Sequence, residues 1–289
     1  MKKYCKIACF LFLGVVNITC KTENIQTQLD PTLEFYLVNG KYDSDGKVNG
    51  KISEKDADRV VFLYITGPSD PDRRTVSYPL ITSLRGIEQF VNLQTIYVED
   101  MSTFKDKSVD FTQNVRLKDI NLNNISPALE EIELSKNYRL ESLYLDKQLR
   151  SSTLSFPMAS NIPLKKITLH NFMNVSINWN LYNTLELLSL NNCKIDKIDV
   201  TKLVKLQDLE ISKSNILAID ISKNIDLKTL TLEENDLSSL DISNNLKLER
   251  LDCYSVYYSK LLTVCIAPNQ TIKYLYKNNF TVLKVCNNN

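Results

Sequence analysis

An acidic loop near the start of the chain carries the residues best suited to bind a metal ion. Its candidate ligands are Asp43, Asp45, Asn49 and Asp56. Carboxylate and amide oxygens are the donors that Ca²⁺ prefers, and the apolar residue Ile52 would anchor such a loop. The spacing is imperfect, because a count back from Ile52 puts Lys47 at a ligand position, and a count from Asp43 needs a two-residue insertion. The loop predicts either a calcium site or a polar turn without an ion, and we expect no other cofactor.

Other site chemistries find little support in the sequence. His170 is the only histidine, and the chain contains neither a Cys-x-x-Cys pair nor a Gly-x-Ser-x-Gly stretch. These observations argue against a zinc site and against a serine or cysteine nucleophile activated by histidine. The net charge is +1, so the chain as a whole has no bias toward nucleic acid. We therefore predict that the protein is not an enzyme and does not bind nucleic acid.

The first residues have the character of an export signal. A basic start precedes an apolar run from Ile7 to Val16 that is too short to span a bilayer. Cys20 follows, and the segment resembles the lipidation site of a bacterial lipoprotein, although Asn17 and Thr19 depart from the usual residues before such a cysteine. We predict a signal peptide at residues 1–19 and a lipid on Cys20. The alternative is an ordinary signal peptide that is cleaved nearby.

Four cysteines remain after Cys20, and export permits them to form disulfides. They are Cys193, Cys253, Cys265 and Cys286. The first two fall at repeat positions where an inward-facing residue is expected, so we assign them to the core. Cys265 and Cys286 lie near the C-terminus, and we predict a disulfide between them that closes the last coil.

The elements that must position any site come from a repeat. Eight leucines recur at intervals of 21 to 24 residues, and we call them head leucines: Leu93, Leu117, Leu140, Leu164, Leu185, Leu206, Leu227 and Leu248. Each begins the pattern Leu-x-x-apolar-x-apolar, and a second short apolar pair follows later in the unit. A fixed period of this length and pattern indicates a leucine-rich repeat solenoid.

Each apolar cluster is about six residues long, which fits a short strand better than a helix. We therefore predict a β-rich, right-handed coil with a parallel concave sheet, little convex helix and a cap at each end. The predicted parts are a lipidated tether (20–32), an N-terminal cap that contains the acidic loop (33–92), about eight repeats (93–261), and a C-terminal cap with a tail (262–289).

Residues between the inward positions of each strand should form columns on the concave side, about 5 Å apart from coil to coil. The candidate binding residues there are Tyr97, Tyr144, Glu210, Thr231, Glu233, Asp252 and Tyr254. Tyrosines make good anchors for a protein partner, and the acidic residues would suit a basic one. The plain alternative is a solvated polar surface.

Two stretches carry a family resemblance. The phrase Leu-Asp-Ile-Ser-Asn-Asn at 240–245 and the leader at 81–93 resemble short repeats of internalin-like surface proteins and of Bacteroidetes-type envelope lipoproteins. Ser214 and Val256 depart from the asparagine ladder of this pattern, whereas Asn235 and Cys193 fit it. The resemblance implies binding of a host or envelope protein.

Two functional hypotheses remain open from the sequence. The first is a monomeric, exported lipoprotein, anchored in the cell envelope at the outer membrane, whose concave face binds an unidentified protein. The second is a structural or scaffold envelope protein without a foreign ligand. Self-association without capture of another protein would favour the second.

Overall fold

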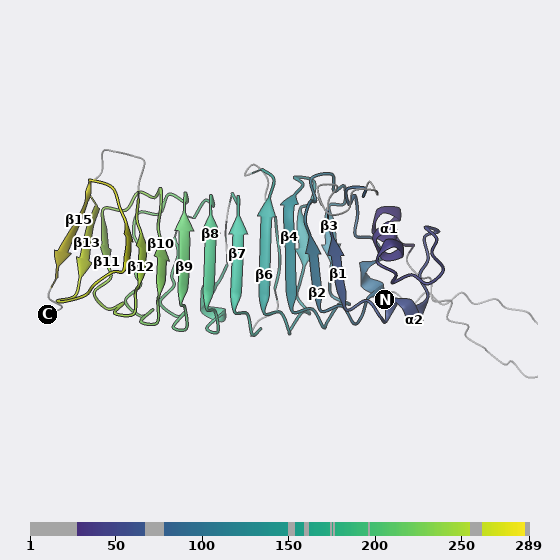
Figure 1. The fold of residues 1–289 in the computed structure, drawn as a ribbon, viewed down its shortest axis with the longest axis horizontal. Helices are drawn as coiled ribbons and strands as arrows, with labels where there is room; N and C mark the ends of the chain where they lie inside the picture. The colour runs from purple at the N-terminus through teal and green to yellow at the C-terminus, as the bar shows by residue number, and fades with distance from the viewer. Residues whose placement is uncertain are drawn as a thin grey trace, which may run out of the picture.

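The computed structural model describes residues 28–66, 78–149, 154–158, 162–173, 175, 177–195, 197–254 and 262–286. These residues form an elongated solenoid whose coils follow one another from the N-terminal helices to the C-terminal strands (Figure 1). The predicted signal peptide, Cys20 and the tail at 287–289 lie outside the described residues. No helix in the described ranges is long and apolar enough to cross a bilayer.

Ten parallel strands form the main sheet. In spatial order they are β1 (Phe62–Ile65), β2 (Thr95–Val98), β4 (Asp119–Ile125), β6 (Ser142–Lys147), β7 (Lys166–His170), β8 (Leu187–Asn191), β9 (Asp208–Ser212), β10 (Thr229–Thr231), β12 (Arg250–Asp252) and β14 (Tyr274–Tyr276). Each neighbouring pair is parallel and joins one coil to the next. The predicted leucine-rich repeat solenoid is confirmed. Strands β1 and β14 extend its sheet beyond the eight predicted repeats.

The wall behind the main sheet consists of short strands and turns. Its strands are β3 (Ser108–Asp110), β5 (Glu131–Glu133), β11 (Ser239–Asp241), β13 (Leu262–Ile266) and β15 (Thr281–Val285). Two 3₁₀ helices, η1 (Ile87–Gln89) and η2 (Trp179–Leu181), also occur. The α-helices in the described ranges are α1 (Pro31–Asn39) and α2 (Glu54–Ala57), both near the N-terminal end (Figure 1). Units this short leave little room for a helix behind each strand, as predicted.

One continuous core runs through the coils. All eight head leucines are buried. In β6, Leu143 and Leu145 are buried while Tyr144 between them is only half-buried, because successive side chains of a strand point to opposite sides. Cys193 and Cys253 are buried in the core, as predicted. Each coil covers the apolar residues of the next, so the coils depend on one another for stability.

Buried asparagines connect the coils at a position that the sequence did not suggest. Asn114, Asn137, Asn224 and Asn245 each lie three residues before a head leucine and are fully buried. Each side-chain amide donates to two carbonyls of the preceding coil. The Nδ2 atom of Asn137, for example, lies 3.1 Å from Phe111 O and 2.9 Å from Asn114 O. Each of these carbonyls also accepts a backbone N–H of its own coil, so the asparagine adds a second hydrogen bond that joins adjacent coils.

The position that the sequence analysis assigned to the asparagine ladder also forms hydrogen bonds, through Asn235 and Ser214. Asn235 Nδ2 donates to Leu232 O at 3.2 Å, and Asn235 Oδ1 accepts from Ser214 N at 3.1 Å. Ser214, which we expected to interrupt the ladder, donates its hydroxyl to Ser212 O at 2.8 Å and accepts from Cys193 N at 3.2 Å. The serine therefore keeps the coils connected, because a hydroxyl both donates and accepts.

The N-terminal end of the solenoid is capped, whereas the final strand β15 leaves Val282, Leu283 and Val285 exposed at the C-terminal end. The N-terminal cap includes Leu29 and Asp30, which the sequence assigned to the tether: Leu29 is buried, and Asp30 caps α1 by accepting from Thr32 N at 2.8 Å. At the other end, Cys265 in β13 and Cys286 after β15 form a disulfide with their Cα atoms 5.4 Å apart. This bond fastens the final strand to the coil before it.

Candidate binding face

The outward side of the main sheet, which we call the open face, presents side chains in columns. The central column contains Tyr64, Tyr97, Asn121, Tyr144, Thr168, Ser189, Glu210, Thr231, Asp252 and Tyr276. Its order from Tyr97 to Asp252 is the predicted one, because parallel pairing sets equivalent residues of adjacent coils side by side. The two terminal tyrosines were not predicted.

The N-terminal end of the column is aromatic. The rings of Tyr64 and Tyr97 stack with centroids 4.3 Å apart and an interplanar angle of 5°. Tyr64 is 63% exposed. Partial burial, followed by the neighbouring Tyr64 and Glu99, raises the pKa of the Tyr97 hydroxyl above its ordinary value. The pair offers a flat apolar surface with hydroxyl groups beside it.

A second aromatic contact lies further along the open face. Tyr144 Oη is 3.4 Å from His170 Nδ1, and the two rings meet edge to face with centroids 5.4 Å apart. Burial, followed by the nearby Asp146 carboxylate, raises the pKa of Tyr144. His170 thus belongs to an aromatic patch of the open face.

The C-terminal half of the open face is acidic. Glu210 accepts from Ser189 Oγ at 2.8 Å and from Asn191 Nδ2 at 3.3 Å. Thr231 pairs in register with Glu210 on one side and Asp252 on the other. Burial, followed by the Asp252 carboxyl, raises the pKa of Glu233. These carboxyl groups lie close enough to repel one another when both are ionised.

Asp252 differs from the expectation of an exposed contact residue. It lies in the predicted column, but it is only 5% exposed. Its neighbours explain this burial, because Arg250 lies 3.6 Å from Asp252 Oδ2 and also stacks over the Tyr276 ring in the next strand. Within the described residues, Asp252 Oδ1 has no hydrogen-bond partner. A buried carboxylate oxygen of this kind is costly unless a donor reaches it.

Aromatic side chains also end the column at its C-terminal side. Tyr254, Tyr274 and Tyr276 are exposed, and the Arg250 guanidinium lies 4.8 Å from the Tyr276 ring centroid. Sequence reasoning placed Tyr274 and Tyr276 in a cap instead of in the main sheet. The spacing from Leu248 to Ile272, with Leu275 three residues later, was the signal that could have identified a further repeat.

The acidic loop is held together by its own hydrogen bonds. Asp45 Oδ2 accepts from Asn49 Nδ2 at 2.7 Å, and Asp43 Oδ1 accepts from Asp45 N at 3.2 Å. Glu34 of α1, which sequence reasoning missed, is fully buried and accepts from the backbone amides of the loop residues 49, 50 and 51. The candidate ligands Asp43, Asp45 and Asn49 therefore lie close together. The carboxylates of Asp43, Asp45 and Glu34 each already accept at least one hydrogen bond from the protein.

Asp56 is directed toward other partners. Its Oδ2 accepts from Ser44 Oγ at 2.7 Å and from Ser53 Oγ at 2.8 Å, and Arg59 lies 3.2 Å from Oδ1. The two serine hydroxyls lower the pKa of Asp56 to about 2. In the described ranges, no three carboxylate, histidine or cysteine side chains gather as a metal site would require. Calcium binding by this loop remains a prediction.

Stacked parallel coils, a repeat of 21 to 24 residues and a long open sheet define a leucine-rich repeat solenoid. The chain is similar to three solved structures from Listeria monocytogenes. They are the functional domain of InlJ (16% identity, TM-score 0.41, 89% of this chain and 72% of that chain), the internalin InlF (16%, 0.41, 88% and 86%) and internalin C2 (14%, 0.40, 89% and 98%). No protein-family model matches the chain, and no curated protein matches it.

Proposed function

We propose that this protein is an exported cell-envelope lipoprotein that binds a protein partner through its open face. The observation that carries the proposal is the central column, which starts with the stacked pair Tyr64 and Tyr97 and continues into an acidic half. A solenoid supplies a long, regular surface of this kind, and such surfaces serve in binding. Catalysis has no part in the proposal.

The aromatic end supplies the anchor. Tyrosine contributes contact area and a hydroxyl at a small cost in side-chain entropy, which is why it is enriched at binding hot spots. Stacking fixes the rings of Tyr64 and Tyr97 before a partner arrives. A partner with an apolar or aromatic side chain would cover this pair.

The acidic half specifies a basic partner. Glu233 and Asp252 share a site in which the Glu233 carboxyl resists ionisation. A lysine or arginine side chain of a partner would pair with the half-buried Glu233 and offset the charge of the buried Asp252 behind it. The partner we propose therefore has an apolar segment for the tyrosines and a basic segment for Glu233 and Asp252.

The proposed envelope location depends on the predicted signal peptide at residues 1–19 and on Cys20. Mass spectrometry of the N-terminal peptide should detect an acylated Cys20, and protease treatment of intact cells should show whether the solenoid is displayed outside the outer membrane. Detection of an unmodified peptide that begins before or after Cys20 would overturn the lipoprotein assignment without affecting the open face.

The binding proposal is tested by affinity capture from envelope and host-cell extracts with purified residues 21–289. The test variants are Tyr64→Ser/Tyr97→Ser and Glu233→Gln/Asp252→Asn. The matched controls are Tyr138→Ser and Glu130→Gln, which change exposed residues away from the open face. A protein captured by the wild type and the controls, but lost from both test variants, supports the proposal. Equal capture by all variants rejects this face, and self-association alone would favour a scaffold.

A further inference from the structure

A second surface lies along the edge of the solenoid where the strands of the main sheet begin, the lower edge in Figure 1. In six coils the turn at this edge exposes one large apolar side chain two residues before the head leucine: Val91, Val115, Tyr138, Val204, Ile225 and Leu246. Ile225 is 56% and Leu246 is 70% exposed. These side chains form a line that does not contribute to the core.

In four of these six turns one of the buried asparagines described above precedes the exposed side chain, and in the other two the buried Phe90 and Leu203 take its place. Asn224 and Asn245 immediately precede Ile225 and Leu246, and each is held inward by two hydrogen bonds to the preceding coil. The following residue must then face solvent at the tip of the turn. The exposure is therefore fixed by the repeat itself.

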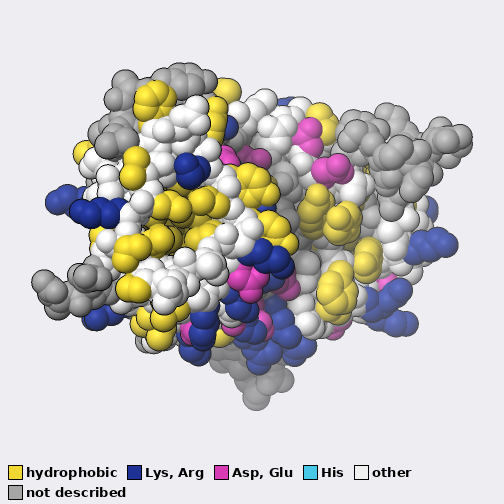
Figure 2. All heavy atoms as spheres, turned by 60° about the vertical axis from the view of Figure 1, so that its left-hand side comes forward, with side chains coloured by type: hydrophobic (Ala, Val, Ile, Leu, Met, Phe, Trp, Pro, Cys, Tyr) yellow, Lys and Arg dark blue, Asp and Glu magenta, His cyan; other side chains and the backbone are white. Residues whose placement is uncertain are grey.

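Lysines accompany the apolar line. The turns 202–207, 223–228, 244–249 and 270–273 contain six lysines and only two carboxylates, Asp226 and Glu249. Asp226 pairs with Lys247, and Lys228 donates to Gln207 Oε1 at 2.9 Å. Figure 2 shows lysine and arginine side chains gathered along this lower edge. The edge is basic although the whole chain has a net charge of only +1, so charge is segregated between this edge and the acidic half of the open face.

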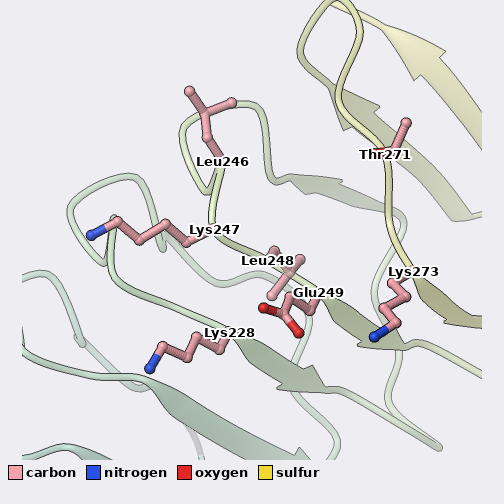
Figure 3. Close-up of a pocket in the computed structure, with 7 residues that line it drawn as sticks. All are labelled: Lys228, Leu246, Lys247, Leu248, Glu249, Thr271 and Lys273. Carbon is pink, nitrogen blue, oxygen red and sulfur yellow. The ribbon is translucent and has the colours of Figure 1, made fainter.

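Three of the lysines surround a hollow in the same edge. Lys228, Lys247 and Lys273 line a space of about 600 Å³ together with Leu246 and Glu249. Figure 3 shows Leu246 at the tip of its turn, while Lys228 and Lys247 extend to the same side from adjacent coils. Several ammonium groups around a hollow suit a phosphate group. The three lysines outnumber Glu249, the one carboxylate among the lining residues.

We propose that this edge, which we call the strand-start edge (Val204, Lys205, Ile225, Lys228, Leu246, Lys247 and Lys273), lies on an anionic lipid surface. Isolated apolar side chains that alternate with lysines are the composition of surfaces that bind the membrane interface. The apolar side chains enter the boundary between head groups and acyl chains, and the lysines contact lipid phosphates. A protein partner fits less well, because lysine is depleted in protein interfaces. The inference concerns a different surface from the open face and does not depend on the proposed function.

The test is co-sedimentation of purified residues 21–289 with vesicles. This segment contains every described element of the fold and lacks the lipidation site. The probes are phosphatidylcholine vesicles with and without a minority of phosphatidylglycerol. The test variants are Ile225→Ser/Leu246→Ser and Lys228→Gln/Lys247→Gln. The matched controls are Leu217→Ser and Lys194→Gln/Lys213→Gln, all exposed residues outside the strand-start edge.

The wild type should sediment with the anionic vesicles and not with the neutral ones. Each test variant should lower the partition coefficient about tenfold or more, and the controls should leave it unchanged. Absence of wild-type binding to anionic vesicles would overturn the proposal, as would equal losses in test and control variants. Loss with the lysine variant but not with the apolar variant would indicate an anion site instead of a lipid-binding edge. Circular dichroism of each variant verifies that the fold is retained.

Discussion

The rings of Tyr64 and Tyr97 stack at 4.3 Å although the two residues belong to different parts of the chain. Tyr64 lies in β1, before the first head leucine, and Tyr97 lies in β2, in the first repeat. Their contact joins the N-terminal cap to the repeats on the open face. It therefore serves both the stability of that junction and the proposed binding surface.

A double-mutant cycle measures this contact. Tyr64→Ala and Tyr97→Ala should show a coupling of about 0.5–1.5 kcal/mol in the free energy of unfolding, since stacked aromatic pairs contribute that much beyond burial. Urea denaturation of both single variants and the double variant gives the value. The cycle of Tyr64→Ala with Tyr144→Ala, two coils beyond Tyr97, should be additive within about 0.5 kcal/mol. Equal coupling in the two cycles would contradict a local stack.

Asn137→Ala should destabilise the solenoid by about 1–3 kcal/mol, because two hydrogen bonds between coils, to Phe111 O and Asn114 O, are lost while both carbonyls keep their backbone donors. The adjacent exposed residue is a matched control, and Tyr138→Ala should change the free energy of unfolding by less than about 0.5 kcal/mol. Urea denaturation measures both. Similar values for the two variants would show that the asparagine bonds do not stabilise the stacking of coils.

Glu233→Gln should stabilise the protein at neutral pH. The pKa of Glu233 is raised above 4.5, so the folded state keeps its proton to a higher pH than the unfolded state. Stability is consequently lost as the pH rises from about the unfolded value through the raised one. Thermal unfolding from acid to neutral pH should show this loss in the wild type and a weaker dependence in the variant.

The effect of Glu141 on the free energy of unfolding should have the opposite dependence on pH to that of Glu233. Its hydrogen bond and ion pair with Lys165 at 2.7 Å lower the pKa of Glu141, so Glu141→Gln should destabilise at neutral pH, by no more than about 1 kcal/mol for an exposed pair. Its contribution should be lost as the pH falls from the unfolded pKa of Glu141 through its lower folded pKa. A stabilising effect of Glu141→Gln would contradict this assignment.

Reduction of the disulfide between Cys265 and Cys286 should destabilise the C-terminal end. The bond closes a loop with a sequence separation of 21, for which the loss of chain entropy corresponds to about 3 kcal/mol. Thermal unfolding with and without dithiothreitol measures the effect. The variant Cys265→Ser/Cys286→Ser should unfold at the temperature of the reduced wild type and should not respond to dithiothreitol. A further response would implicate Cys193 or Cys253.

The repeat made much of the fold predictable from the sequence. Because each head leucine fixes which strand residues point inward, the spacing of Leu206 and Leu227 alone determines that Glu210 and Thr231 lie side by side. The same logic correctly placed the column from Tyr97 to Asp252. Local periodicity carries this information, since every coil repeats the environment of the previous one.

Other features of the site depend on what lies next to a coil in space. The sequence placed Tyr64 and Tyr276 in caps, but β1 and β14 pair with repeat strands and add both tyrosines to the open face. The repeat period predicted the column of Asp252. Its burial instead depends on Arg250 of the same strand, which stacks over Tyr276 of β14.

The sequence by itself thus determined the solenoid, its parallel sheet and the order of residues along its columns, because these follow from the interval between leucines. Only the tertiary structure decided which column residues are exposed, which asparagines connect the coils and which turns form a basic, apolar edge. Those properties arise from contacts between coils, and a contact depends on the shape and polarity of both partners, which no single repeat contains.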